Sequence, residues 1–265
     1  MTLLSLIRGI LSEKMKENIS SKIDEHPLLF GPMITLFYHI LLIPVSKKKA
    51  MLLSATKKVK IYTFSNKDSW NVFHEIYYEQ IYGKTKREDV VIDVGANVGM
   101  FTIKSIKEVG NDGLVIAIEP EPRNLVLLRK NTKIFNNVIV VPKAVGDSKR
   151  KIKLFIANTS GGHSIKRNKG HGYIEVEIDL LDNIISELGA KRVDFIKIDV
   201  EGAEKEVLEG AKEILLKFHP KIALEYHSIQ NMQEVSRILT DLGYLIEVAE
   251  KSKLKELGYI YGRYK

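Results

Sequence analysis

The hydrophobic pattern of the chain alternates between short β-branched runs and longer segments of helical periodicity. Buried strands are predicted at residues 90–92, 114–118 and 138–141, with helices at 100–109 and 123–135 between them. After residue 180 the same pattern predicts helices at 180–188, 203–218 and 231–242 and strands at 193–198, 221–225, 244–248 and 259–264. This order is typical of an α/β protein with a parallel sheet built from right-handed βαβ units.

Residues 151–180 break this pattern. Positions 152–156 and 173–178 alternate between apolar and polar side chains, as half-exposed antiparallel strands do. We therefore predict an inserted β-hairpin on the substrate side. Upstream of the first buried strand, we expect a short strand at 57–64 and an aromatic-rich helix at 70–82.

The N-terminal part of the chain has a different character. Apolar spacing predicts an amphipathic helix at residues 3–11, and residues 28–45 are almost entirely apolar. Pro32 and Pro44 limit a continuous helix to 33–43, about 16 Å, whereas the hydrocarbon core of a bilayer is about 30 Å thick. For residues 28–45 three alternatives remain open: a helix packed on the protein, an interfacial membrane anchor and a membrane-spanning helix. We divide the chain into a helical extension, residues 1–60, and a catalytic domain, residues 61–265.

The charge of the chain is concentrated in that extension. Of the net charge of +8 over 265 residues, residues 1–60 carry +6, from ten Lys and Arg against four Asp and Glu. A nucleic-acid partner is therefore not expected for the catalytic domain. The chain has no cysteine, which excludes disulfides and thiolate sites and fits a cytoplasmic protein. One of the open alternatives is a peripheral contact of residues 1–50 with the inner membrane face.

The sequence VVIDVGANVG at residues 90–99 has the form of a strand, a glycine turn and the start of a helix. Asp93 closes the strand, Gly95 allows a tight bend and Gly99 allows the next helix to pack closely. Glu119 ends the following strand, where an acid accepts hydrogen bonds from ribose hydroxyls in adenosine-cofactor sites.

The spacing of this turn separates two cofactors. Dinucleotide sites use G-x-G-x-x-G, which the G-A-N-V-G turn lacks. S-adenosylmethionine carries an ammonium, a carboxylate and a sulfonium in place of a phosphate. We expect Asp93 near the ammonium and the amides of the turn near the carboxylate.

Two further strand ends carry candidate catalytic residues. The sequence DFIKIDVEGAE places Asp199 and Glu201 at the carboxyl end of one buried strand, and LEYH places Glu225 and His227 at the end of another. His227 is a candidate general base, with Glu225 orienting its ring, and Asp199 is the alternative. Asp199 with Glu225 could instead hold a divalent ion, although we predict no metal site. His163 and His171 in the insertion are weaker candidates.

Taken together, the strings VVIDVGANVGMFTI, IEPEPRNLVLLRKN, VPKAVGD, DFIKIDVEGAEKEVLEGA and LEYH closely resemble the FkbM-type family of S-adenosylmethionine-dependent methyltransferases. The resemblance covers about residues 70–243. It implies a class I, Rossmann-like, seven-stranded sheet and O-methylation of hydroxyls on sugars or secondary metabolites. It implies cofactor contacts at Asp93, Gly95, Ala96, Asn97, Gly99, Glu119, Pro120, Ala144 and Asp199, and an active edge of Asp199, Glu201, Glu225 and His227.

These observations predict a methyltransferase that moves the methyl group of S-adenosylmethionine in line to a hydroxyl of a small molecule, sugar, glycan or glycolipid. Methylation of RNA or protein is the first alternative, and an NAD-dependent oxidoreductase the second. Lys166, Arg167 and Lys169 in the insertion would favour an acidic or phosphorylated glycan.

Overall fold

The computed structural model describes residues 40–44, 49–54, 59–64, 68–157, 161–168, 170–250 and 257–265. The chain divides into two compact units, Met1–Tyr77 and Tyr78–Lys265, and each is described by itself. This boundary falls later than residue 60, where the sequence analysis placed it. The division into an extension and a catalytic domain stays a prediction.

The first unit contains a small antiparallel sheet. Its order is β1-β2-β3, with β1 at Ile40–Pro44, β2 at Lys49–Ser54 and β3 at Val59–Phe64. The predicted helix at 33–43 is therefore wrong over residues 40–43, because the apolar run ILLIP pairs edge to edge with β2. Helix α4, Asp68–His74, and a π-helical turn η1, Glu75–Glu79, replace the single predicted helix at 70–82. The predictions for 3–11 and 33–39 lie outside the described residues.

No helix among the described residues combines the length and the apolar character needed to cross a bilayer. The expected membrane contact of residues 1–50 falls largely outside the described part of the chain and stays a prediction.

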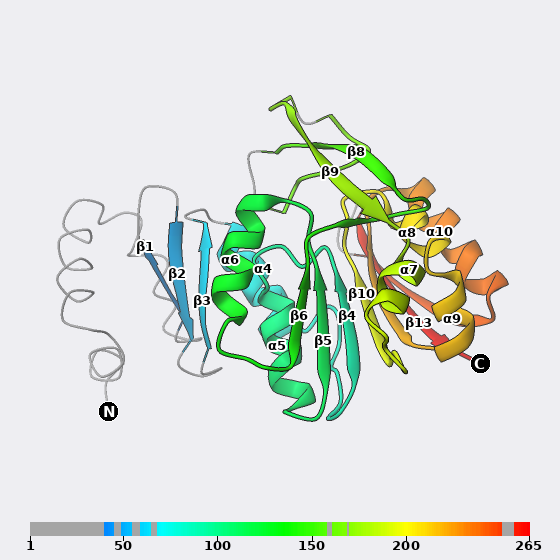
Figure 1. Ribbon diagram of the computed structural model, residues 1–265, viewed down its shortest axis with the longest axis horizontal. Helices are drawn as coiled ribbons and strands as arrows, with labels where there is room; N and C mark the ends of the chain where they lie inside the picture. Colours follow the sequence, from blue (N-terminus) through cyan, green and yellow to red (C-terminus); the bar gives the residue numbers. More distant parts are fainter. Residues whose placement is uncertain are drawn as a thin grey trace. The chain divides into compact units, whose positions relative to one another are not determined.

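The second unit is organised around a seven-stranded sheet of order β12-β13-β11-β10-β4-β5-β6 (Figure 1). Its strands are β4, Val90–Val94; β5, Leu114–Ile118; β6, Val138–Val141; β10, Phe195–Ile198; β11, Lys221–Tyr226; β12, Tyr244–Glu250; and β13, Gly258–Tyr264. Strand β13 runs antiparallel to both β11 and β12, and the other neighbouring pairs are parallel. The predicted class I, Rossmann-like α/β sheet is confirmed.

Helices cover both faces of this sheet (Figure 1). On one face lie α5, Met100–Val109, and α6, Pro122–Thr132; on the other lie α7, Leu181–Glu187, α8, Glu204–Glu209, α9, Lys212–Phe218, and α10, Ile229–Asp241. The central strands β4 and β10 are buried along almost their whole length, as their β-branched runs predict.

One predicted helix is divided in two. The segment expected to be continuous over 203–218 ends as α8 at Glu209 and restarts as α9 at Lys212. A Cβ atom on Gly210 would lie 2.0 Å from the carbonyl oxygen of Gly146, so the backbone passes directly against another segment at this point. The break between α8 and α9 therefore depends on the contact of Gly210 with Gly146, which lies far away in the sequence.

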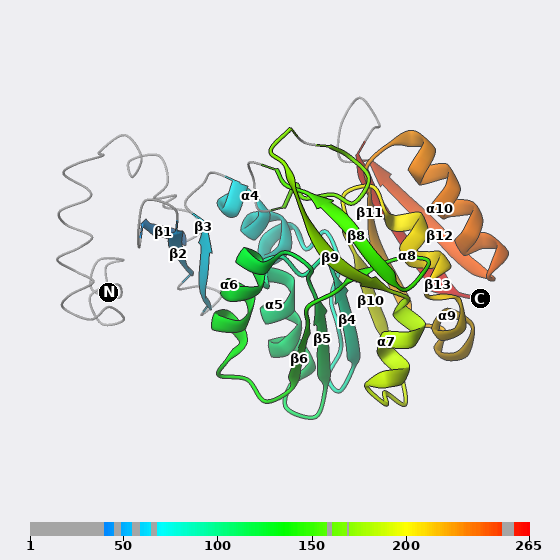
Figure 2. The same ribbon diagram turned by 45° about the horizontal axis from the view of Figure 1, so that its top comes forward.

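The predicted hairpin is present between β6 and α7. Strand β8, Arg150–Phe155, pairs antiparallel with β9, Tyr173–Asp179, and the short strand β7, Ala144–Val145, adds to β9 in parallel. Leu154, Val176 and Ile178 form a small core under this sheet. Figure 2, in which the top of the molecule comes forward, shows β8 and β9 in front of one end of the main sheet.

Candidate active site

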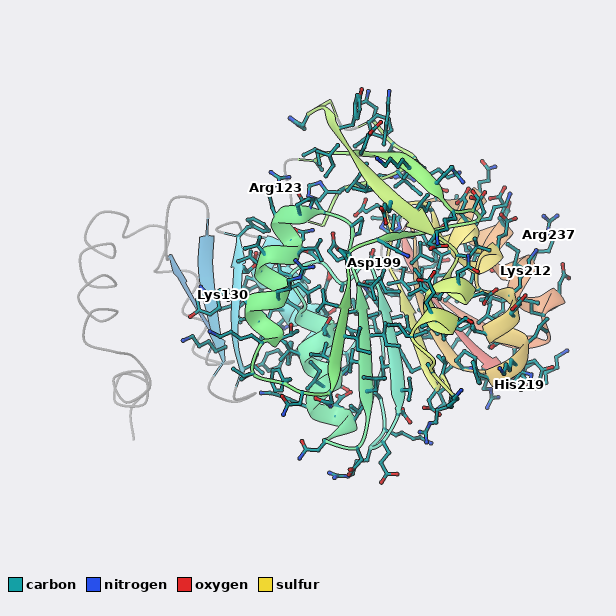
Figure 3. The ribbon with its side chains drawn as sticks, in the orientation of Figure 1. Arg123, Lys130, Asp199, Lys212, His219 and Arg237 are labelled. Carbon is teal, nitrogen blue, oxygen red and sulfur yellow. The ribbon has the colours of Figure 1, made fainter. Side chains whose placement is uncertain are left out.

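A cavity lies where the carboxyl ends of β4, β5 and β10 meet the inserted sheet, and its empty space, including the part open to solvent, is about 630 Å³. Open α/β sheets bind their ligands at this edge. The lining includes seven residues that the sequence indicated, namely Gly95, Asn97, Glu119, Pro120, Ala144, Asp199 and Glu201. Figure 3 shows Asp199 at this end of the sheet, below the insertion. Five other residues named in the sequence analysis are not among the described residues that line the cavity, namely Asp93, Ala96, Gly99, Glu225 and His227.

The glycine turn has little room for side chains. Gly95 has a φ of +76°, and a Cβ atom there would lie 1.9 Å from the carbonyl oxygen of Asp199. The turn therefore brings the backbone of two strand ends into contact. A Cβ atom on Gly99 would lie 2.6 Å from the Leu128 side chain, so the start of α5 also approaches α6 closely at this glycine.

The amides of this turn are used within the protein. The N–H groups of Gly95 and Ala96 both donate to the carbonyl of Ile118 at 3.0 Å, and the N–H of Asn97 donates to Glu119 Oε2 at 2.8 Å. These three amides are therefore paired within the protein, and the expectation that amides of the turn meet a ligand carboxylate stays a prediction. The end of the neighbouring strand β5 supplies their acceptors.

Glu119 is buried, with its carboxylate in the cavity lining. Oε1 accepts from the N–H of Glu121 at 3.0 Å and from the Asn124 amide at 3.2 Å. Burial raises the pKa of Glu119 to about 7, although the N–H groups of Glu121 and Asn97 oppose the shift. Oε2 accepts a single hydrogen bond, from the N–H of Asn97, so this oxygen keeps acceptor capacity for a ribose hydroxyl.

Asp93 is paired within the protein. It is fully buried, accepts from Thr102 Oγ1 at 2.6 Å and lies 3.1 Å from Lys197 Nζ. Lys197 also donates to the carbonyl of Gly95 at 2.8 Å. Burial lowers the pKa of Lys197, but the charges of Asp93 and Asp199 outweigh burial and raise it. Asp93 therefore pairs with a buried cation next to the turn, and its expected place near a ligand ammonium stays a prediction.

Tyr82 joins two of the candidate acids. Its hydroxyl lies 2.8 Å from Glu225 Oε2 and 3.0 Å from Asp199 Oδ2. Burial and the charges of these two carboxylates raise the pKa of Tyr82 well above its usual value. Because a phenol has one proton to donate, the hydroxyl is shared between the two acids.

His227 is placed differently from the expectation. Strand β11 ends at Tyr226, so His227 no longer follows the strand alternation, and its Nδ1 lies 3.0 Å from Glu204 Oε1. Glu204, not Glu225, orients the ring. Burial would lower the pKa of His227, but contact with Glu204 and the charges of Asp199 and Glu201 raise it to about 9. In this state His227 is a cation at neutral pH and a poor general base.

Three residues at this site escaped the sequence analysis. Lys197 stands in the middle of a fully buried strand and Tyr82 follows the aromatic run, while Glu204 looked like an ordinary first-turn acid of a helix. A lysine inside an apolar strand is the signal that could have been used, because a buried lysine needs a partner. Of the weaker histidines, His163 lines the cavity and His171 is exposed.

Comparisons with known proteins agree with this architecture. The chain is 29% identical over 149 residues to the 2-O-methyltransferase NoeI of Sinorhizobium fredii, a match that covers 50% of this chain and 61% of NoeI. It is 28% identical over 221 residues to the 31-O-demethyl-FK506 methyltransferase FkbM of Streptomyces tacrolimicus, covering 69% of this chain and 84% of that protein.

A solved structure of methyltransferase FkbM from Methylobacillus flagellatus superposes with a TM-score of 0.54 at 19% identity. The match covers 72% of this chain and 47% of that structure, so the chain spans about half the length of that protein. This likeness supports the fold.

The model of the methyltransferase FkbM domain matches residues 93–246, which include the glycine turn, Glu119 and both acidic strand ends. That stretch contains most of the second unit and every strand that contributes to the cavity. The chain therefore belongs to the FkbM family of S-adenosylmethionine-dependent methyltransferases.

Proposed function

We propose that this protein transfers the methyl group of S-adenosylmethionine to a hydroxyl oxygen of a sugar or glycan. The observation that carries this proposal is the position of Asp199 and Glu201, two partly exposed carboxylates in the wall of the same cavity as Glu119. The relatives NoeI and FkbM are named as O-methyltransferases, which supports an oxygen acceptor. Family membership argues against the alternative of an NAD-dependent oxidoreductase.

The cavity offers different surroundings to the two ends of the cofactor. Ile118, Ala144, Val145 and Leu154 make an apolar side, suited to an adenine ring, next to Glu119 for the ribose. Asp199 and Glu201 add an acidic part to the same lining. In-line transfer removes the positive charge of the sulfonium, so surroundings poor in water favour it. Holding the acceptor oxygen in line with the methyl carbon and the sulfur supplies much of the rate.

The basic residues of the insertion are engaged within the protein. The Lys166 ammonium forms an ion pair with Glu206, and Arg167 donates to the carbonyl of His227 at 2.7 Å. Lys169 lies outside the described residues. With two of the three cations committed and acids on the cavity wall, we favour a neutral sugar over an acidic one. Its adjacent hydroxyls would donate hydrogen bonds to Asp199 and Glu201.

The test is isotopic transfer. Protein is incubated with methyl-labelled S-adenosylmethionine and separate pools of neutral oligosaccharides, acidic oligosaccharides, glycolipids, RNA and protein. We expect label in an ether linkage on a neutral carbohydrate, lost in the Glu119→Gln variant and retained in Glu175→Gln, a matched change on the exposed edge of β9. Transfer confined to RNA or protein would contradict the carbohydrate assignment.

We also propose a cytoplasmic location at the membrane face, through residues 1–50. The full chain is expected to sediment with anionic lipid vesicles, and removal of residues 1–50 is expected to abolish sedimentation. Sedimentation that persists without these residues would contradict this assignment.

A further inference from the structure

Three potential metal ligands from two adjacent strand ends converge beside the cavity. One donor atom each from Asp199, Glu201 and His227 lies within 4.8 Å of the other two. His227 Nε2 is 3.8 Å from Asp199 Oδ1 and 3.7 Å from Glu201 Oε1. These separations are too long for hydrogen bonds and are of the size expected between ligands that share one ion.

The imidazole is held with Nε2 toward this cluster. His227 is about nine-tenths buried, and its Nδ1 contacts Glu204, which is fully buried. Glu204 Oε1 also accepts the N–H of Gly202 at 3.0 Å, so the loop that carries Glu201 fixes the same carboxylate. A carboxylate behind a histidine ring, with the second nitrogen pointing at other ligands, is the usual support of a metal-binding histidine.

We propose that Asp199, Glu201 and His227 bind one divalent transition-metal ion such as Mn²⁺. One imidazole nitrogen with two carboxylate oxygens suits manganese or iron better than Mg²⁺, which prefers oxygen ligands alone. Glu225, paired with Asp199 in the sequence analysis, is replaced in this set by Glu201 and His227, whose donor atoms lie within 4.8 Å of that of Asp199. Three protein ligands leave coordination positions open toward the cavity.

A metal ion here would act on the acceptor. Coordination lowers the pKa of a bound hydroxyl, so its O–H bond breaks and the proton passes to solvent water. The oxygen then forms a bond to the methyl carbon, and the electron pair of the C–S bond stays on sulfur, which leaves S-adenosylhomocysteine. In this arrangement the three side chains act by holding the ion, and His227 needs no proton-accepting role.

The test measures binding by the full chain after chelator treatment, with Mn²⁺ alone and detection of free Mn²⁺ by electron paramagnetic resonance. We expect about one ion per chain. The Asp199→Asn and His227→Gln variants should bind at least tenfold more weakly. The matched control is His219→Gln, which changes an exposed histidine well separated from Asp199 in Figure 3 and should bind like the wild type.

Wild-type binding no tighter than that of Asp199→Asn would overturn the site, as would full binding by a His227→Gln variant that is folded. Folding of each variant is checked by circular dichroism. The metal site goes beyond the acceptor proposed above, and no acceptor is present in this assay. A failed metal-binding test would therefore not contradict the proposed acceptor, and a failed transfer test would not contradict the metal site.

Discussion

The carboxylates at this site differ in the groups that surround them. Asp93 has the ammonium of Lys197 beside it, whereas Glu119 is surrounded by the N–H groups of Asn97 and Glu121. Burial raises the pKa of Glu119, because neutral donors compensate burial only in part. Residues of one chemical type, all at strand ends, therefore act differently, as a structural anchor and as a candidate ligand contact.

Glu119 predicts a pH-dependent affinity for the nucleoside. Its pKa of about 7 means that the carboxylate becomes ionised as the pH rises through neutrality. Ribose hydroxyls donate more strongly to the charged form, so affinity should rise about tenfold from about pH 6 to pH 8, as the ionised fraction grows from about a tenth to about nine-tenths. Calorimetry with methylthioadenosine measures this cleanly because that ligand lacks the titrating amino-acid part.

The Glu119→Gln variant should bind methylthioadenosine weakly at every pH in this range, and Glu175→Gln should follow the wild-type curve. A wild-type affinity that stays flat from about pH 6 to pH 8 would contradict the role given to this carboxylate.

Tyr82 predicts a stability effect at the same edge of the sheet. Removal of its hydroxyl in Tyr82→Phe leaves Glu225 and Asp199 without a shared donor, and Glu225 is buried. The free energy of unfolding should fall by about 1–3 kcal/mol. Urea denaturation measures it, with Tyr173→Phe, an exposed tyrosine on β9, as the control. Equal stability of the two variants would show that the shared hydroxyl contributes nothing.

The residues of the site could be named from the sequence more readily than their contacts. Gly95, Glu119 and Asp199 were found because turn and strand-end positions have a local signature, and all three line the cavity. The partners of Asp93 and His227 were not found, because Lys197 and Glu204 come from strands and helices that only the folded sheet brings alongside. Charge pairing across a sheet leaves no spacing pattern in one chain.

Elements followed the sequence where local preference and burial agree. Strands β5 and β6 have the predicted bounds, and β4 extends two residues further than predicted, because β-branched runs suit buried parallel strands. The predicted and observed elements differ where contacts with a distant segment determine the backbone conformation. Helical periodicity runs through residues 203–218, yet Gly146 meets Gly210 and ends α8. At β1, pairing with β2 overrides an apolar run that reads equally well as a helix.

The break between α8 and α9 predicts an unusual response to alanine. Helix propensity alone expects Gly210→Ala to stabilise, by up to about 1 kcal/mol. The structure expects the opposite, a loss of about 1–3 kcal/mol, because the new Cβ would meet the Gly146 carbonyl oxygen at 2.0 Å. Thermal and urea unfolding measure the change, with Ser186→Ala on the exposed face of α7 as the control. A stabilised Gly210→Ala variant would disprove the contact.

At the scale of the whole second unit, the cavity is a product of topology. The glycine turn, the end of β5, the loop after β10 and the insertion lie far apart in the chain and meet at one edge of the sheet. The parallel strand order brings the first three together, and β7 ties the insertion to the same edge through its pairing with β9. The candidate site therefore depends on the insertion as well as on the sheet.

That dependence can be tested by hydrogen exchange with S-adenosylhomocysteine bound. A ligand at about 100 times its dissociation constant adds about 2.7 kcal/mol to the folded state, so openings that release it should slow by about 100-fold. Amides at 94–97, 118–124 and 199–203 should be protected, and so should 161–165, because His163 and Ile165 line the cavity. Strands β12 and β13, outside the described lining, should exchange unchanged. Slower exchange at 94–97, 118–124 and 199–203 but not at 161–165 would show that the cofactor binds without contacting the insertion. The insertion would then contribute to acceptor binding alone.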